Sequence, residues 1–120
     1  MVTMTVIVKN FDKYKIDFHS DYYSLAQNDY GVKNYIQIEC YNNQTRVANL
    51  FFFDKLSLLK NSYQSSSGVD VINLFYQLDR FDEIYNLIRR EIPLHVTIDD
   101  KTLNGNVGST QIEPAGELDV

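Results

Sequence analysis

The chain has little of what disulfide, metal or phosphate-binding frameworks require. Cys40 is its single cysteine, which excludes an internal disulfide and any zinc site built on cysteine, and is typical of a reducing compartment. Its five glycines are isolated from one another, so the chain contains no glycine-rich phosphate loop. We therefore expect neither a metal site nor a cofactor.

Long apolar runs are also missing. No stretch approaches the roughly 18 to 20 apolar residues of a membrane-spanning helix. Residues 1–5 have neither the charged nor the apolar region of a signal peptide. These features predict a cytoplasmic protein with no membrane partner.

The acidic charge is concentrated at one end of the chain. Residues 99–120 carry five acidic side chains and one lysine, a net charge of −4 out of −5 for all 120 residues. The rest of the chain is therefore nearly neutral. Nucleic-acid-binding proteins usually present a basic surface, because neutralised phosphates supply most of the affinity. We do not expect general nucleic-acid binding.

Strand-forming residues dominate the composition. Val, Ile and Thr together number 26, whereas Ala numbers three, and this balance favours β-strands. Seven segments have strand character: 2–8, 13–19, 35–41, 45–54, 69–76, 94–98 and 103–110. Asn10-Phe11-Asp12 and Asn42-Asn43 are predicted hairpin turns, since asparagine tolerates the positive φ of tight turns. Residues 54–68 are predicted to be a connection, and we find no internal repeat.

One helix is predicted in the second half of the chain. Asp79 is a favoured N-cap, and Arg89-Arg90 fill the last turn, where the helix dipole favours positive charge. Apolar side chains recur at i, i+3, i+4 and i+7, namely Phe81, Ile84, Tyr85 and Ile88. Pro93 ends the pattern. We predict an α+β fold, with an antiparallel β-sheet of about seven strands and one main helix at about 79–92. A strongly curved or barrel-like sheet is an alternative shape for the same strands.

The length predicts one α+β domain over residues 1–120. Its acidic C-terminal end, residues 112–120, shows no periodicity and can be flexible. Asp99-Asp100 is predicted to be a solvated hairpin turn, because the spacing of a calcium loop is absent. Cys40 alternates with Ile36 and Ile38, which predicts a buried thiol.

Several segments of the second half form a recognisable series. They are two strands rich in aromatic residues, a helix end with the sequence Leu87-Ile88-Arg89-Arg90-Glu91-Ile92-Pro93, and the closing segment Thr110-Gln111-Ile112-Glu113-Pro114-Ala115-Gly116-Glu117. Over residues 45–118 this series resembles a family of small bacterial proteins of unknown function. The family pattern is Leu-Leu-Arg-x-Glu-x-Pro followed by Thr-x-x-Glu-Pro-Val-Gly-Glu, from which Ile88 and Ala115 depart. The resemblance implies a similar fold and brings no activity, cofactor or partner.

Glu113 and Glu117 form the most distinctive candidate binding site, together with Arg89 and Arg90. Two carboxylates around a Pro-Ala-Gly turn could bind a cation, a basic partner or a substrate hydroxyl. Alternatively, Glu113 pairs with one of the two arginines and fixes the end of the chain. The second interpretation is the simpler one.

Aromatic residues supply further candidates in the first half. Tyr22, Tyr23 and Tyr35 belong to a run of seven aromatic side chains within residues 14–41. Such residues are enriched in protein interfaces, but they also pack in cores and stack on bases or sugars. The positive charge of nearby lysines is compatible with binding of a small anionic ligand.

These observations favour a binding or interaction protein that acts as a homo-oligomer, a homodimer or higher. The apolar segment 50–53 and a single covering helix would leave a sheet face or edge in need of a partner. A small enzyme is one alternative, using Glu113, Glu117, Asp99 or His95 between subunits. However, the chain contains no known catalytic motif. A binder of nucleotides or single-stranded nucleic acid through the tyrosine-rich half is the other alternative.

Overall fold

The structure, a computed structural model, describes residues 6–20, 34–54, 60–66, 68–90 and 93–110. They form eight strands, a short 3₁₀ turn and one α-helix. In chain order these are β1 (Val6–Phe11), β2 (Lys13–Ser20), β3 (Asn34–Asn42), β4 (Thr45–Phe53), β5 (Ser62–Ser66), β6 (Val69–Gln77), η1 (Leu78–Arg80), α2 (Phe81–Arg90), β7 (Leu94–Asp99) and β8 (Gly105–Ser109). The α-helix begins later than predicted, because Asp79 lies in the 3₁₀ turn.

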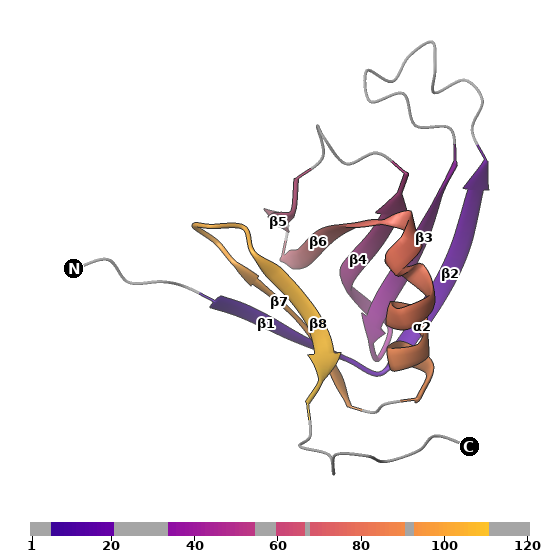
Figure 1. Ribbon diagram of the computed structural model, residues 1–120. Helices are drawn as coiled ribbons and strands as arrows, with labels where there is room; N and C mark the ends of the chain where they lie inside the picture. Colours follow the sequence, from indigo (N-terminus) through magenta and orange to yellow (C-terminus); the bar gives the residue numbers. More distant parts are fainter. Residues whose placement is uncertain (1–5, 21–33, 55–59, 67, 91–92, 111–120) are drawn as a thin grey trace.

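The strands form two sheets, neither of which is closed (Figure 1). The order is β1-β7-β8 in the three-stranded sheet and β2-β3-β4-β6-β5 in the five-stranded sheet. β4 and β6 pair in parallel, and the other described pairs are antiparallel. The α+β class with antiparallel sheets is confirmed. The predicted single sheet of about seven strands, and its barrel-like version, are wrong.

The predicted hairpin at residues 10–12 is the place where the two sheets separate. β1 pairs with β7, whereas β2 pairs with β3. Between them, the backbone N–H of Asp12 donates to the carbonyl oxygen of Tyr41 at 3.0 Å. Phe11 is 2% exposed and belongs to the core. The sequence pattern identifies both strands but not their partners, which is why this hairpin prediction failed.

The core lies between the sheets and beneath α2 (Figure 1). The five-stranded sheet contributes the buried side chains of Ile38, Cys40, Ala48, Leu50, Phe52, Ile72 and Leu74. The three-stranded sheet contributes Phe11, Leu94, Val96 and Ile98, and the helix contributes Ile84 and Ile88. Cys40 is buried as predicted, and burial raises the pKa of its thiol. This thiol is therefore protonated and unreactive.

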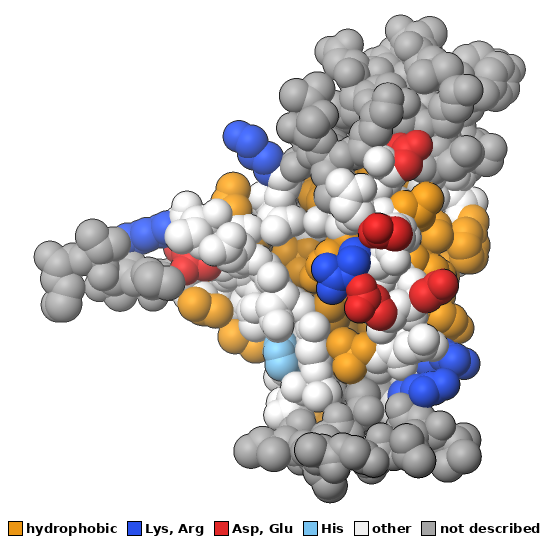
Figure 2. Space-filling view, viewed as in Figure 1, with side chains coloured by type: hydrophobic (Ala, Val, Ile, Leu, Met, Phe, Trp, Pro, Cys, Tyr) orange, Lys and Arg blue, Asp and Glu red, His pale blue; other side chains and the backbone are white. Residues whose placement is uncertain are grey.

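The predicted apolar stripe of α2 is confirmed. Ile84 and Ile88 are buried, and the half-buried rings of Phe81 and Tyr85 lie against aromatic rings of the sheet. Charged side chains cover the outer side of the helix, and hydrophobic side chains reach the surface beside it (Figure 2). No helix in the described part of the chain is long and apolar enough to cross a membrane.

Two predicted turns are confirmed in position, but Asp99 in the second turn is buried rather than solvated. Asn43, between β3 and β4, has φ 60°, the conformation for which asparagine was expected there. Between β7 and β8, the Asp99 carboxylate accepts the backbone N–H groups of Lys101 at 2.8 Å and Thr102 at 3.2 Å. Asp99 is 6% exposed, so its buried carboxylate is satisfied by the turn that it shapes.

Candidate functional site

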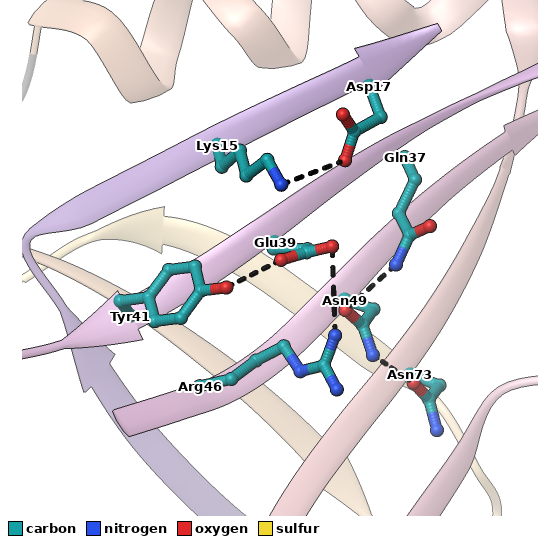
Figure 3. A network of polar contacts seen from close by, with 8 residues as sticks. All are labelled: Lys15, Asp17, Gln37, Glu39, Tyr41, Arg46, Asn49 and Asn73. Carbon is teal, nitrogen blue, oxygen red and sulfur yellow. Dashed lines mark hydrogen bonds and ion pairs between the residues drawn. The ribbon is translucent and has the colours of Figure 1, made fainter. Parts of the chain in front are cut away.

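The face of the five-stranded sheet turned away from α2, which we call the open face, has no described helix or strand packed against it. It consists of alternate residues of the strands, whose sequence neighbours point into the core. Its main side chains are His19, Tyr35, Gln37, Glu39, Tyr41, Asn49, Phe51, Phe53, Asn73 and Phe75. Figure 3 shows most of its polar members.

One end of the open face is an aromatic ladder, formed by His19, Tyr35, Phe53, Phe51 and Phe75. The His19 and Tyr35 rings stack with centroids 4.4 Å apart, and Tyr35 stacks on Phe53 at 4.7 Å. Phe75 stacks on Phe51 at 4.9 Å and on Phe53 at 5.8 Å. The ladder thus crosses β2, β3, β4 and β6. Because the rings stack on one another, they turn edges rather than faces outward.

The middle of the open face is an amide row, formed by Gln37, Asn49 and Asn73 (Figure 3). Gln37 donates to Asn49 Oδ1 at 3.2 Å, and Asn49 donates to Asn73 Oδ1 at 2.9 Å. Asn73 in turn donates to Ser62 Oγ at 3.2 Å and to Gln64 Oε1 at 3.3 Å. Asn49 is 8% exposed and Asn73 is 7% exposed, so these bonds satisfy amides that would otherwise be costly to bury.

The other end of the open face carries charges of both signs. Glu39 accepts a 2.5 Å hydrogen bond from the Tyr41 hydroxyl and lies 3.7 Å from Arg46 Nη1. The bond to Glu39 raises the pKa of Tyr41. Lys15 and Asp17 lie 4.0 Å apart on β2. The open face therefore grades from aromatic through amide to charged along the strands, with little net charge.

A short internal repeat supplies two rings of the ladder and two amides of the amide row. Asn49-Leu50-Phe51-Phe52 and Asn73-Leu74-Phe75-Tyr76 lie in register on the parallel strands β4 and β6. Like side chains therefore face each other, as in other in-register parallel strands. The prediction of no internal repeat is therefore wrong, and of these residues the sequence pattern identified only those in the apolar segment 50–53. The Asn-Leu-Phe-aromatic pattern, spaced by 24 residues, was the signal that could have found them.

The predicted binding residues that the structure describes, Tyr35, Arg89 and Arg90, lie on two different sides of the five-stranded sheet. Tyr35 lies in the aromatic ladder, whereas Arg89 lies on α2, across the sheet. Arg89 donates to Asn86 Oδ1 through Nη2 at 2.9 Å, and its Cζ lies 5.5 Å from the Tyr85 ring centroid. Arg90 is exposed in the same turn. Tyr22, Tyr23, Glu113 and Glu117 lie outside the described residues, so the pairing of Glu113 with an arginine stays a prediction.

Two of the side chains considered for catalysis, His95 and Asp99, lie in the described part of the chain and have structural partners there. His95 Nε2 lies 3.2 Å from Asn106 Oδ1, and its Nδ1 lies 3.3 Å from Thr110 Oγ1. Asp99 shapes the β7–β8 turn. Within the described ranges, no group of three or more His, Cys, Asp or Glu side chains could hold a metal ion. A shallow depression of about 400 Å³ is lined by residues 54 and 77–79, and both of its carboxylates, Asp54 and Asp79, are exposed.

Comparisons of the chain with protein-family models, with curated protein sequences and with solved structures find no match. The resemblance to the bacterial family of unknown function therefore stays a prediction.

Proposed function

We propose that this protein acts by binding another protein, as a homo-oligomer, and that the open face is its contact surface for a protein partner. The observation that carries the proposal is the aromatic ladder, which crosses four strands on a face that no described element covers. Aromatic residues are enriched in the centres of protein interfaces, where polar groups form the rim. The ladder and the amide row beside it bring aromatic and polar side chains together on one face.

The stacking of the ladder favours a protein surface over a nucleic-acid base. Proteins that bind single strands offer ring faces on which successive bases stack. Here the faces of Tyr35, Phe51 and Phe75 lie against other rings of the same chain. Ring edges form a flat apolar strip, which suits the side chains of a partner protein.

The charge of the open face supports the same choice. Lys15 and Arg46 are offset by Asp17 and Glu39, and the two pairs lie 4.0 Å and 3.7 Å apart. A phosphate would have to compete with these carboxylates. Strong nucleic-acid binding requires several unopposed basic groups, which the described open face does not provide.

Site-specific photo-crosslinking in living cells tests this proposal. A benzophenone amino acid at Gln77, which is exposed and lies opposite Phe53 beside the ladder, should form one reproducible adduct with a protein. The matched control replaces Lys101, an exposed residue of the β7–β8 turn, and should not give that adduct. The proposal is wrong if position 77 gives no protein adduct, or only the products that position 101 gives.

A further inference from the structure

The edge of the five-stranded sheet formed by β2 is an unpaired strand with exposed aromatic side chains. Within the described chain, β2 pairs only with β3. Phe18 is 72% exposed and Tyr14 is 37% exposed. Both point to the helix side, where Phe18 contacts the Phe81 ring at 5.9 Å and Tyr14 contacts the Tyr85 ring at 6.1 Å. An unpaired edge with exposed apolar side chains is a template for another strand.

The residues of β2 are arranged as a chemical palindrome around Ile16. Lys15 and Asp17 flank it on the open face, and Tyr14 and Phe18 flank it on the helix face. If two copies of β2 pair antiparallel with Ile16 on the twofold axis, Lys15 of each copy faces Asp17 of the other. In the same register, Tyr14 of each copy faces Phe18 of the other. Opposite charges and paired aromatic side chains are the cross-strand contacts that stabilise antiparallel strands.

The register with Ile16 on the axis is more favourable than the two adjacent registers. Because side chains alternate between the two faces, the pairing can shift only in steps that keep each side chain on its own face. Moving the axis by one residue toward the N-terminus brings the two copies of Lys15 together. Moving it one residue toward the C-terminus brings the two copies of Asp17 together. Directly opposed like charges are destabilising, so the axis at Ile16 is favoured.

The other sheet edges lack this complementarity. β1 exposes Val6 and Val8, but its charged residue, Lys9, lies 3.6 Å from Asp70 of β6. β5 and β8 are each five residues long and carry no charged side chain. β2 has eight residues and both charge signs, so it is the edge best suited to pair with its own copy.

We propose that two copies of this chain associate through their β2 strands, with Ile16 on the twofold axis, to form one continuous sheet. The inference rests on the proposed function, of which it specifies the contact within the homo-oligomer. A twofold axis normal to the sheet puts both α2 helices on one side, running in opposite directions. The acidic first turn of each helix then lies toward the same end of the junction as the basic last turn of the other. The junction uses the edge of β2 and leaves the open faces of both copies outside it.

Charge-reversed variants test the pairing by light scattering and sedimentation velocity. Lys15→Asp alone and Asp17→Lys alone should each weaken the dimer by roughly tenfold or more, because each turns two attractive contacts into repulsive ones. An equimolar mixture of the two variants should recover the wild-type affinity, since the aspartate introduced at position 15 then faces lysine. Each substitution also changes the contact between residues 15 and 17 within its own chain. That change is the same whether the variant is measured alone or in the mixture. Recovery on mixing therefore reports contact between chains.

A matched control and the possible outcomes distinguish a failure of the β2 pairing from a failure of the proposed function. Val8→Ser removes a 55% exposed side chain from the other sheet and should leave the dimer unchanged. If the wild type dimerises but mixing the variants restores nothing, the β2 register is wrong and the homo-oligomer stands. If the wild type stays monomeric at high micromolar concentration, both the pairing and the homo-oligomer are wrong. The protein contact at the open face is judged separately, by the adduct at position 77.

Discussion

Phe81 connects the helix to aromatic side chains on the helix side of the five-stranded sheet. Its ring meets Phe52 edge-on at 5.3 Å and Phe18 at 5.9 Å, and it stacks on Tyr85 at 5.5 Å. The side chain is half-buried, so these contacts, rather than complete burial, fix it in place. Aromatic pairs add free energy beyond the area that they bury.

Phe81→Ala should therefore lower the free energy of unfolding by about 3 kcal/mol, the low end of the range for truncation of a buried phenylalanine. Urea denaturation at low protein concentration measures this loss. Phe18→Ala is the matched control, since Phe18 is 72% exposed and its loss should cost less than about 1 kcal/mol in the monomer. Equal losses for the two variants would contradict the assigned helix face.

Gly105 marks a close approach between the two sheets. A Cβ atom at this position would lie 2.3 Å from Leu74 Cδ2 and 3.2 Å from the carbonyl oxygen of Thr97. Leu74 is 1% exposed, so its side chain cannot move away into solvent. Gly105→Ala should destabilise the protein by about 1 to 3 kcal/mol, as overpacking of a filled core does.

Gly108→Ala is the control for this prediction. At that position the nearest atom to a new Cβ is His95 Nε2 at 3.4 Å, an ordinary contact, so the melting temperature should barely change. A larger fall for Gly108→Ala than for Gly105→Ala would refute the packing of β8 over β6.

At the level of elements, the parallel pair β4 and β6 determines the character of the open face. The pair brings Asn49 opposite Asn73 and Phe51 opposite Phe75. The two asparagines bond at 2.9 Å although both are nearly buried. A buried amide without its partner costs more than a bonded pair contributes. The amide row therefore favours this register of the two strands over its alternatives.

Substitution of one asparagine should cost more than substitution of both. Asn73→Leu leaves the Asn49 amide buried without its acceptor and should destabilise by about 1 to 3 kcal/mol. Adding Asn49→Leu replaces both partners by apolar groups and should recover most of that loss. A double-mutant cycle by urea denaturation measures the coupling. Strictly additive losses would show that the two amides do not act as a pair.

The sequence predicts elements well where a local pattern determines them. The stripe of Phe81, Ile84, Tyr85 and Ile88 and the turn at Asn43 depend on residues near one another in the chain. β5 was missed within the predicted connection 54–68, because Tyr63 is the single apolar residue of its Ser-Tyr-Gln-Ser-Ser sequence. An edge strand of this kind is specified by its pairing with β6, which no local pattern reveals.

The candidate site was less predictable than the elements. Tyr35 was correctly placed on a strand, and the apolar segment 50–53 lies on a strand with apolar residues on both faces. The ladder, however, depends on which strands are neighbours, and β4 and β6 lie side by side although β5 separates them in the chain. That arrangement is a tertiary property. The density of tyrosines in the first half pointed instead to residues outside the described ranges.

At the level of the whole molecule, an ion pair joins the two sheets at their surface. Lys9 of β1 lies 3.6 Å from Asp70 of β6, whose carboxylate also accepts a 2.6 Å hydrogen bond from Ser65. The Ser65 bond lowers the pKa of Asp70 from its ordinary value of 3.8, helped by Tyr63 and Lys9. A lowered pKa in the folded state means that the carboxylate stabilises the fold when it is ionised.

This contribution should be present above the ordinary aspartate pKa of 3.8 and disappear as the pH falls through the lower folded value. Asp70→Asn should therefore be less stable than the wild type near neutral pH, and the difference should shrink in strong acid. Urea denaturation across this pH range measures it. Asp100→Asn changes an exposed carboxylate of the β7–β8 turn and should leave the free energy of unfolding nearly unchanged near neutral pH. A constant difference between Asp70→Asn and the wild type would contradict the assigned role.

The central claim is that this small domain works by contact with other protein chains, beginning with its own copy. Hydrogen exchange of the wild-type protein at low and at high micromolar concentration tests it most directly. The account predicts that amides of residues 13–20 become slower to exchange at high concentration, while those of β8, the edge of the other sheet, stay unchanged. Identical exchange of β2 at both concentrations, with a monomeric mass throughout, would contradict it.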